Sequence, residues 1–316
     1  MKNNLKKKRL NKVMLKTPVV YICFNRPSIT KKTFKQIRNQ KPKKLFLIMD
    51  GPRMGKKKDI KNCIKVKEII SNIDWKCKVY KNFSKKNLGS KNRIVSGLNW
   101  VFTKVDRAII LEDDCYPSND FFYFCETLLN YYEKNKRISV ITGNNFQTKW
   151  INSFSYYFSK YSHIWGWATW KRTWNLFNDN HKDIENFLNS KKFERISKIH
   201  DEQNYWKSMY DQIKRGVLKS WAYYFLLNIW EKGGLTVTPN FNLVKNLGID
   251  SNSGSNKIDS NLKISLTDIK LDVPMVHPRS IIVDERADKQ VFYSIYKKNI
   301  KTRLKYRLKK MINYLK

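Results

Sequence analysis

Three consecutive acids, Glu112, Asp113 and Asp114, follow the apolar run 108–111. Adjacent carboxylates repel one another, and each raises the proton affinity of its neighbours. A hard divalent cation such as Mg²⁺ or Mn²⁺ relieves that repulsion and can also bind substrate phosphates. The position favours such a site, because open α/β sheets bind ligands beyond the carboxyl ends of their strands. The alternative is a solvated turn that carries acids by chance, and the triplet alone leaves both interpretations open.

The elements that would position these acids alternate between strand and helix. Apolar runs predict strands at 18–24, 44–49, 76–80, 108–111 and 138–142, with helices expected at 28–40, 59–72, 89–103 and 120–134. This alternation is typical of a parallel sheet with crossover helices. The first turn lacks G-x-G-x-x-G, and no G-x-x-x-x-G-K-[ST] is present, which disfavours a dinucleotide-binding Rossmann domain and a P-loop.

The second half of the sequence is rich in aromatic residues from 156 to 174, around Trp165-Gly166-Trp167. These rings can stack on a sugar face or belong to the core, and Gly166 permits a close backbone approach. Helical patterns follow at 193–214 and 223–232, then a short strand at 235–238. The polar stretch 250–256 predicts a mobile loop.

The composition is strongly basic, with 64 Lys and Arg against 26 Asp and Glu and a net charge of +38. Such a charge attracts polyanions: nucleic acid, anionic lipid or phosphorylated substrates. A general bias of the sequence toward Lys, Asn and Ile would also account for part of this positive charge. The five cysteines form no CxxC pair, which favours reduced thiols in a cytosol. No apolar run reaches the roughly 18–20 residues of a membrane span.

The C-terminal segment 290–316 places apolar residues at helical spacing and fills the other face with Lys and Arg. This pattern predicts a basic amphipathic helix that lies on an anionic membrane surface. The alternative is a helix docked on the domain with a solvated charged face.

Several short motifs together resemble bacterial nucleotide-sugar glycosyltransferases related to the N-acetylglucosaminyltransferase I family. The resemblance covers about 18–248 and, more weakly, Val276-His277-Pro278. In chain order the motifs are Phe24-Asn25-Arg26-Pro27, Asp50-Gly51-Pro52-Arg53, Asn87-Leu88-Gly89, Leu111-Glu112-Asp113-Asp114 with Pro117 and Asp120-Phe121-Phe122, and Gly166-Trp167.

The resemblance implies a GT-A fold, an α/β domain with a mostly parallel sheet and helices on both faces. A basic tail at 1–16 would precede the catalytic domain at 17–285, with the nucleotide-sugar half at 17–145, the aromatic-rich acceptor half at 146–285 and the basic helix at 286–316. Asp114 would ligate Mn²⁺ or Mg²⁺, with His277 as a further metal or diphosphate contact. The implied donor-binding residues are Arg26, Asp50, Lys91, Glu112 and Asp113, and the acceptor residues are Trp165, Gly166, Trp167 and Trp221.

An inverting transferase also needs a general base to accept the proton of the acceptor hydroxyl. Relatives carry an acid directly after the tryptophan that matches Trp221, whereas this chain has Ala222. Asp211, Glu231 and Asp250 are the candidate substitutes, and we favour Asp250 because it follows Asn246-Leu247-Gly248, which resembles the acceptor-side loop of relatives.

The resulting hypothesis is a metal-dependent glycosyltransferase of surface polysaccharide synthesis. It would transfer a sugar to a glycan or lipid-linked acceptor at the cytoplasmic face of a bacterial membrane. The expected donor is a UDP-sugar. One alternative is a basic nucleic-acid-binding protein, although the basic residues form no recognised module. The other is a nucleotidyltransferase of related fold, although the first turn lacks the glycine pattern expected of that class.

Overall fold

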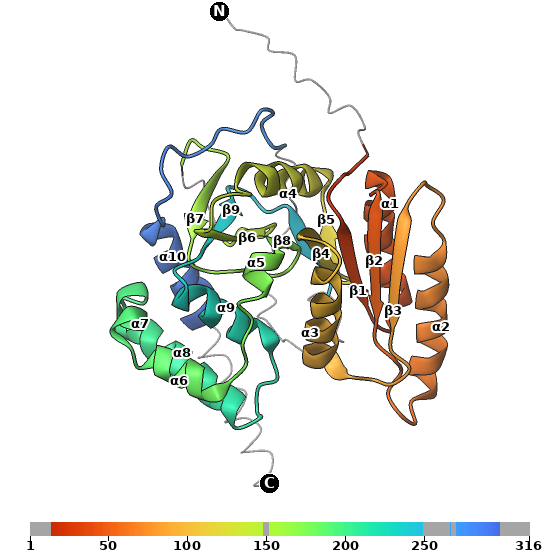
Figure 1. Cartoon of the computed structure of the whole chain (residues 1–316), viewed down its shortest axis with the longest axis horizontal. Helices are drawn as coiled ribbons and strands as arrows, with labels where there is room; N and C mark the ends of the chain where they lie inside the picture. The colour runs from red at the N-terminus through yellow and green to blue at the C-terminus, as the bar shows by residue number, and fades with distance from the viewer. Residues whose placement is uncertain (1–13, 148–151, 249–265, 267–269, 298–316) are drawn as a thin grey trace, which may run out of the picture.

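The structure, a computed structural model of the chain, describes residues 14–147, 152–248, 266 and 270–297. Its centre is one eight-stranded sheet with the order β3-β2-β1-β4-β8-β6-β9-β7 (Figure 1). The strands are β1 (Val19–Cys23), β2 (Lys44–Met49), β3 (Lys78–Phe83), β4 (Arg107–Glu112), β6 (Ile138–Thr142), β7 (Tyr156–Ser159), β8 (Trp167–Trp170) and β9 (Leu235–Pro239).

Within this sheet only β7 and β8 run against the direction of the other strands. The α/β class and the mostly parallel sheet expected from the sequence are therefore confirmed. A second sheet of two strands pairs β5 (Cys115–Pro117) with β10 (Val244–Asn246) in antiparallel register. This pairing brings the chain near residue 246 back beside the acidic turn after β4.

Helices cover both faces of the large sheet. The helices are α1 (Pro27–Gln40), α2 (Lys57–Ser71), α3 (Gly89–Phe102), α4 (Asn119–Tyr131), α5 (Lys171–Trp174), α6 (His181–Leu188), α7 (Lys191–Ile196), α8 (His200–Lys214), α9 (Trp221–Glu231), α10 (Glu285–Val291) and the π-helical η1 (Phe292–Lys297). One apolar cluster joins α1, α2 and α4 to one face, and another joins α3 and α9 to the opposite face. Side chains alternate between these clusters along β1, β2 and β4, as the period of two in a strand requires.

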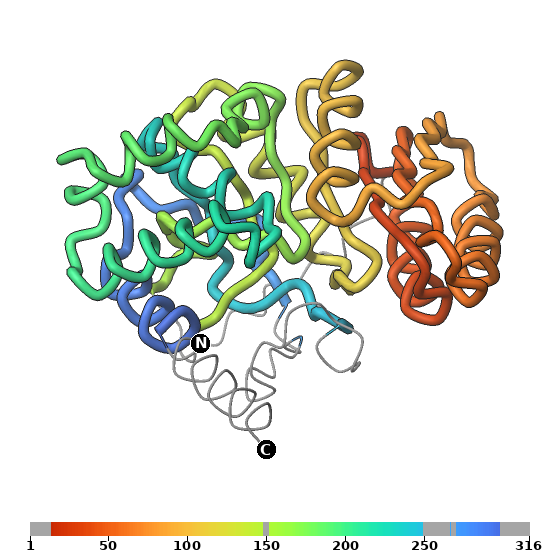
Figure 2. Tube along the Cα trace, turned by 90° about the horizontal axis from the view of Figure 1, so that it is seen from below, coloured from red at the N-terminus to blue at the C-terminus, as the bar shows by residue number. Residues whose placement is uncertain are grey.

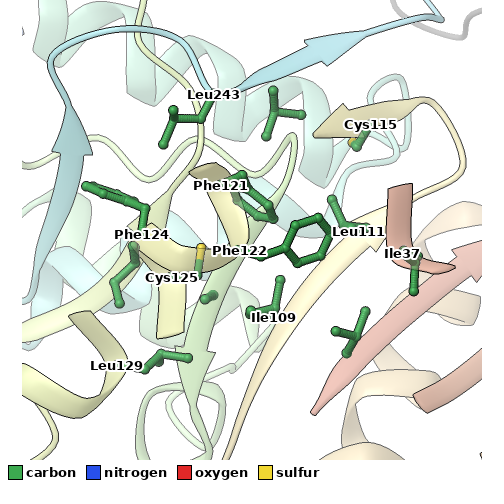
Figure 3. Packing of buried hydrophobic residues seen from close by; sticks show 14 of the residues in the cluster. Ile37, Ile109, Leu111, Cys115, Phe121, Phe122, Phe124, Cys125, Leu129 and Leu243 are labelled. Atoms are coloured by element: carbon green, nitrogen blue, oxygen red, sulfur yellow. The ribbon is translucent and has the colours of Figure 1, made fainter. Parts of the chain in front are cut away.

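The core beneath the acidic turn is densely aromatic. Phe121 and Phe122 of α4 lie beside Leu111 of β4, and Phe124 points to the other side of the helix, toward Tyr156 (Figure 3). All three rings are essentially inaccessible to water. Burial of such side chains stabilises the fold by about 1.5–3 kcal/mol each. The end of β4, which carries the acids, therefore rests on a rigid support.

A second core lies away from the sheet, between α6, α7, α8, α9 and η1. The helix expected at 193–214 is interrupted, because α7 ends at Ile196 and α8 begins at His200. The described start of the C-terminal segment packs into this core through Phe292 and Ile295. Through residue 297 the segment is therefore docked on the domain, while 298–316 and the loop expected at 250–256 lie outside the described residues.

Candidate active site

A cleft of about 1260 Å³ opens beyond the carboxyl ends of β1, β2 and β4. At one end it is lined by charged and polar residues that include Arg26, Asp50 and the acids 112–114. At the other end it is lined largely by aromatic and aliphatic side chains from the 146–165 region, α8, the start of α9 and η1. The cleft therefore has one end suited to an ionic ligand and one suited to a flat or apolar ligand.

Arg26 lies over two of the three acids. It precedes α1, and its side chain reaches the turn after β4, 87 residues later in the chain. Its Nη2 contacts Asp113 closely and lies 3.1 Å from Oδ2 of Asp114, and its Nε lies 3.3 Å from Oδ2 of Asp113. A guanidinium fork that bridges neighbouring carboxylates holds both of them in a defined geometry.

Glu112 and Asp113 remain in an environment that disfavours their charged forms, although Arg26 lies beside the acidic turn. Burial raises the pKa of Glu112, and the charges of Asp114 and Asp113 raise it further. Burial also raises the pKa of Asp113, although Arg26 opposes that shift. The pKa of Arg26 itself is raised by these carboxylates against the effect of its own burial, so the arginine stays charged. One guanidinium thus compensates only part of the negative charge, and the site can accept additional positive charge.

The surroundings of Asp114 fit a divalent cation that is shared with a ligand. Its side chain keeps 19% of its surface exposed, in contrast to 3% for Asp113. A Cβ placed on Gly248 would lie 2.7 Å from Oδ2 of Asp114, so the backbone of 246–248 closes against this carboxylate. Among the described residues no three His, Cys, Asp or Glu side chains form a closed metal site. One carboxylate completed by substrate phosphates and water is nevertheless a usual environment for Mg²⁺ or Mn²⁺.

Asp50 has a positioning function in this structure. Its carboxylate accepts hydrogen bonds from the backbone N–H of Leu88 (2.9 Å) and Gly89 (3.1 Å) and from Nδ2 of Asn87 (3.0 Å). It thereby ties the end of β2 to the start of α3. The motifs Asp50-Gly51 and Asn87-Leu88-Gly89, distant in sequence, form one wall of the cleft.

A second ion pair beside this wall was not anticipated from the sequence. Asp59 of α2 accepts hydrogen bonds from Nη2 of Arg53 (3.0 Å) and Nδ2 of Asn25 (2.7 Å). The hydrogen bond from Arg53, together with that from Asn25, lowers the pKa of Asp59 to about 2. Arg53 is largely exposed and faces the cleft. It adds positive charge to the charged end of the cleft.

The aromatic residues expected to bind an acceptor divide into two groups. Trp165 lies on the cleft and is partly exposed, and Trp221 also borders it although only 4% of its surface is accessible. Trp167 is 1% exposed and packs on Trp221 and Phe225, so it is a core residue. Gly166 has φ +76°, and a Cβ there would lie 2.8 Å from Cγ2 of Val244. It allows the chain to turn from Trp165 on the cleft to Trp167 in the core.

Other predicted site residues lie elsewhere. Lys91 pairs with Asp179 at 2.9 Å and does not line the cleft. His277 stacks on Tyr131 with ring centroids 4.0 Å apart and is hydrogen-bonded to the hydroxyl of Tyr156, again outside the cleft lining. The structure therefore does not bring either residue together with the acids.

The three candidate bases are likewise not assembled at the cleft. Asp211 is exposed on α8, and Glu231 is partly exposed at the end of α9, and neither lines the cleft. Asp250 lies outside the described residues. Ala222, which follows Trp221, does border the cleft.

His163 is a cleft residue that the sequence did not single out. In the described part of the chain it is the only histidine that lines the cleft, and its ring meets Phe146 edge-on at 4.4 Å. Burial lowers its pKa to about 3, so the imidazole is neutral at pH 7 and one ring nitrogen can accept a hydrogen bond. His163 belongs to no recognised motif, so nothing in the sequence indicated it.

No protein-family model and no curated protein matches this sequence. Partial likenesses occur among solved structures. The inositol-1-phosphate CTP transferase from T. maritima is 9% identical, with a TM-score of 0.39 over 80% of this chain and 98% of that one. The mannosyltransferase PcManGT from Pyrobaculum calidifontis, solved with GDP-Man and Mn²⁺, is 8% identical, with a TM-score of 0.35 over 52% of this chain.

The likeness to the mannosyltransferase covers 46% of that enzyme, less than half of its length. UDP-glucose pyrophosphorylase, solved with UDP-glucose, is 8% identical with a TM-score of 0.29 over 51% of this chain and 78% of that one. These are enzymes that transfer sugars or nucleotides, and the overlaps concern part of the backbone. We therefore base the function on the side chains of the cleft.

Proposed function

We propose that this protein is a metal-dependent glycosyltransferase of the GT-A type, which uses a nucleoside-diphosphate sugar as donor. The observation that carries the proposal is the bipartite cleft: Glu112, Asp113 and Asp114 with Arg26 at one end, and a largely aromatic surface at the other. The charged end suits a cation and a diphosphate, and the aromatic end suits a sugar-bearing acceptor.

In the proposed reaction the charged end binds and orients the donor. Asp114 would hold a Mn²⁺ or Mg²⁺ ion, which would supply Lewis-acid stabilisation of the leaving diphosphate. Arg26 and Arg53 can donate charge-assisted hydrogen bonds to phosphate oxygens. Asp50 holds the 87–89 backbone in place beside the nucleoside. A uridine nucleotide is the expected donor, following the resemblance in the sequence.

The acceptor would enter over Trp165 and the neighbouring aromatic side chains. Transfer with inversion requires a group that accepts the proton of the acceptor hydroxyl while the new glycosidic bond forms and the diphosphate departs. Asp250 remains a candidate for that role. Burial leaves His163 too weak a base at pH 7 to take the proton, so its neutral ring would accept a hydrogen bond from the acceptor hydroxyl and orient it.

We further propose that the enzyme acts on a glycan or lipid-linked acceptor of surface polysaccharide synthesis, at the cytoplasmic face of a bacterial membrane. The basic pattern of 290–316 supports this location, since lysine-rich helices bind anionic lipid surfaces. No helix in the described ranges is both long enough and apolar enough to cross a bilayer.

The test is a thermal-shift screen of UDP- and GDP-sugars with and without Mn²⁺. An assay for the released nucleoside diphosphate follows. We expect one donor to raise the melting temperature only with metal, because a ligand that binds the folded state stabilises it by mass action. EDTA and Asp114→Ala should abolish turnover, whereas Asp74→Asn, at an exposed site outside the cleft, should not. Turnover that persists in EDTA contradicts the proposal, and pyrophosphate release from CTP or UTP identifies a nucleotidyltransferase instead.

A further inference from the structure

The outer face of α2 carries exposed apolar side chains among lysines. Ile60 is 48% exposed and Ile64 is 55% exposed, and they lie one turn apart on the same side of the helix. Met54, in the loop before the helix, is 99% exposed. Single exposed apolar residues are ordinary in proteins, but three within eleven residues form a local group.

The positive charge around this group has no partner in the described part of the chain. Five exposed lysines that surround this group form no ion pair among the described residues: Lys56, Lys57, Lys58, Lys61 and Lys65. A sixth exposed lysine of the helix, Lys67, lies over the ring of Phe83. The acids of the helix are Asp59, which is buried against Arg53, and Glu68 on the outer face. We call Met54, Ile60, Ile64 and these five lysines the α2 surface.

The buried face of α2 explains why the α2 surface is available. Cys63, Val66 and Ile70 pack into the main core, so the opposite face necessarily points outward. Figures 1 and 2 place α2 at the end of the molecule farthest from α10. The α2 surface is therefore separate from the docked start of the C-terminal segment.

We propose that the α2 surface docks on an anionic phospholipid bilayer, independently of the C-terminal segment. Exposed apolar side chains that enter the headgroup region, surrounded by lysines that meet lipid phosphates, are the pattern of interfacial membrane binding. Charge complementarity favours this occupant, because five lysines on one face would repel a second copy of this basic chain. Arg53, Lys58 and Asn62 lie at the junction of this surface and the cleft, so the charged end of the cleft opens beside the lipid.

The experiment uses the full chain with a thiol-reactive, environment-sensitive fluorophore at Ile64→Cys. Ile282→Cys is the matched control, since Ile282 is 70% exposed on a different part of the molecule. Labelled parent protein gives the background from the native cysteines. With phosphatidylglycerol-containing vesicles, the label at 64 should shift to the blue and be quenched by nitroxide lipids, and the label at 282 should do neither. Pure phosphatidylcholine vesicles should give no shift.

A second measurement removes the apolar contacts. Ile60→Ser with Ile64→Ser should reduce partitioning onto the anionic vesicles at least tenfold, because about half of each side chain is available for burial. Ile282→Ser, at another exposed apolar site outside the cleft, should leave partitioning unchanged. Circular dichroism and the melting temperature of each variant verify that it is folded.

A label at 64 that stays in water while the protein is vesicle-bound overturns the inference and leaves the proposed transferase function untouched. A blue shift that depends on protein concentration without lipid assigns the surface to self-association and also overturns it.

Discussion

Replacing Arg26 by methionine should expose the electrostatic strain of the acidic turn. Asp113 is almost fully buried, and its side-chain contacts with Arg26 would be lost. Removal of one partner from a buried ion pair typically costs about 3–5 kcal/mol. Since Arg26 retains 25% exposure, we expect the lower part of this range, about 3 kcal/mol. For a chain of this size that lowers the melting temperature by roughly 5–10 °C.

The loss of stability caused by Arg26→Met should increase as pH rises. Burial raises the pKa of Asp113 above its value in the unfolded chain, so the folded state favours the protonated acid. The stabilisation that comes from protonated Asp113 is therefore lost as pH rises through the folded pKa. Arg26 opposes that shift, and its removal raises the pKa further. The destabilisation by Arg26→Met should therefore be large at pH 8 and small at pH 5, as measured by urea unfolding in EDTA-containing buffer.

A double-mutant cycle provides the control. Arg26→Met with Asp113→Asn should recover much of the lost stability, because the second change removes the unpaired buried charge. A destabilisation below about 1 kcal/mol at pH 8, or one that does not change with pH, would refute the view that Arg26 compensates these acids.

Two further predictions concern the turn at Gly166 and the histidine of the cleft. Gly166→Ala should destabilise the protein by about 2–3 kcal/mol in urea unfolding, because it combines a left-handed backbone with a contact 2.8 Å from Val244. Gly216→Ala, with φ +69° and open space, should cost only about 1 kcal/mol, and equal losses would show that packing at Gly166 is unimportant. His163→Phe, which removes a hydrogen-bond acceptor from the cleft, should raise the acceptor KM about tenfold with little change in donor KM, whereas His277→Phe should leave both constants unchanged. An unchanged acceptor KM in His163→Phe would show that this ring does not position the acceptor.

Much of the fold was predictable because local patterns agree with the tertiary environment. The strand expected at 138–142 is observed with the same limits, and those at 18–24 and 44–49 agree within about a residue. These runs are mostly apolar because helices cover both faces of the sheet. The interruption at 197–199 was not predictable from periodicity, since the apolar spacing of α7 continues into α8 while the chain bends to form the second core.

The site was predictable in part for the same reason. A triplet of acids after a buried strand reaches the sheet edge in any parallel α/β arrangement, so the position of Asp114 followed from local pattern. Trp165 and Trp167 are indistinguishable in sequence, but they have different environments because β8 is inserted antiparallel between β4 and β6. Trp167 thereby lies beside Ile110 within the sheet.

The sequence by itself determined the class of fold, the acidic turn at the end of β4 and the strongly basic character of the chain, because each depends on residues that are neighbours in sequence. Only the tertiary structure decided that Arg26 bridges Asp113 and Asp114, that His163 lines the cleft, and that Lys91 and His277 do not. Those outcomes depend on contacts between residues far apart in the chain. Packing of whole elements, which no local pattern encodes, brings such residues together.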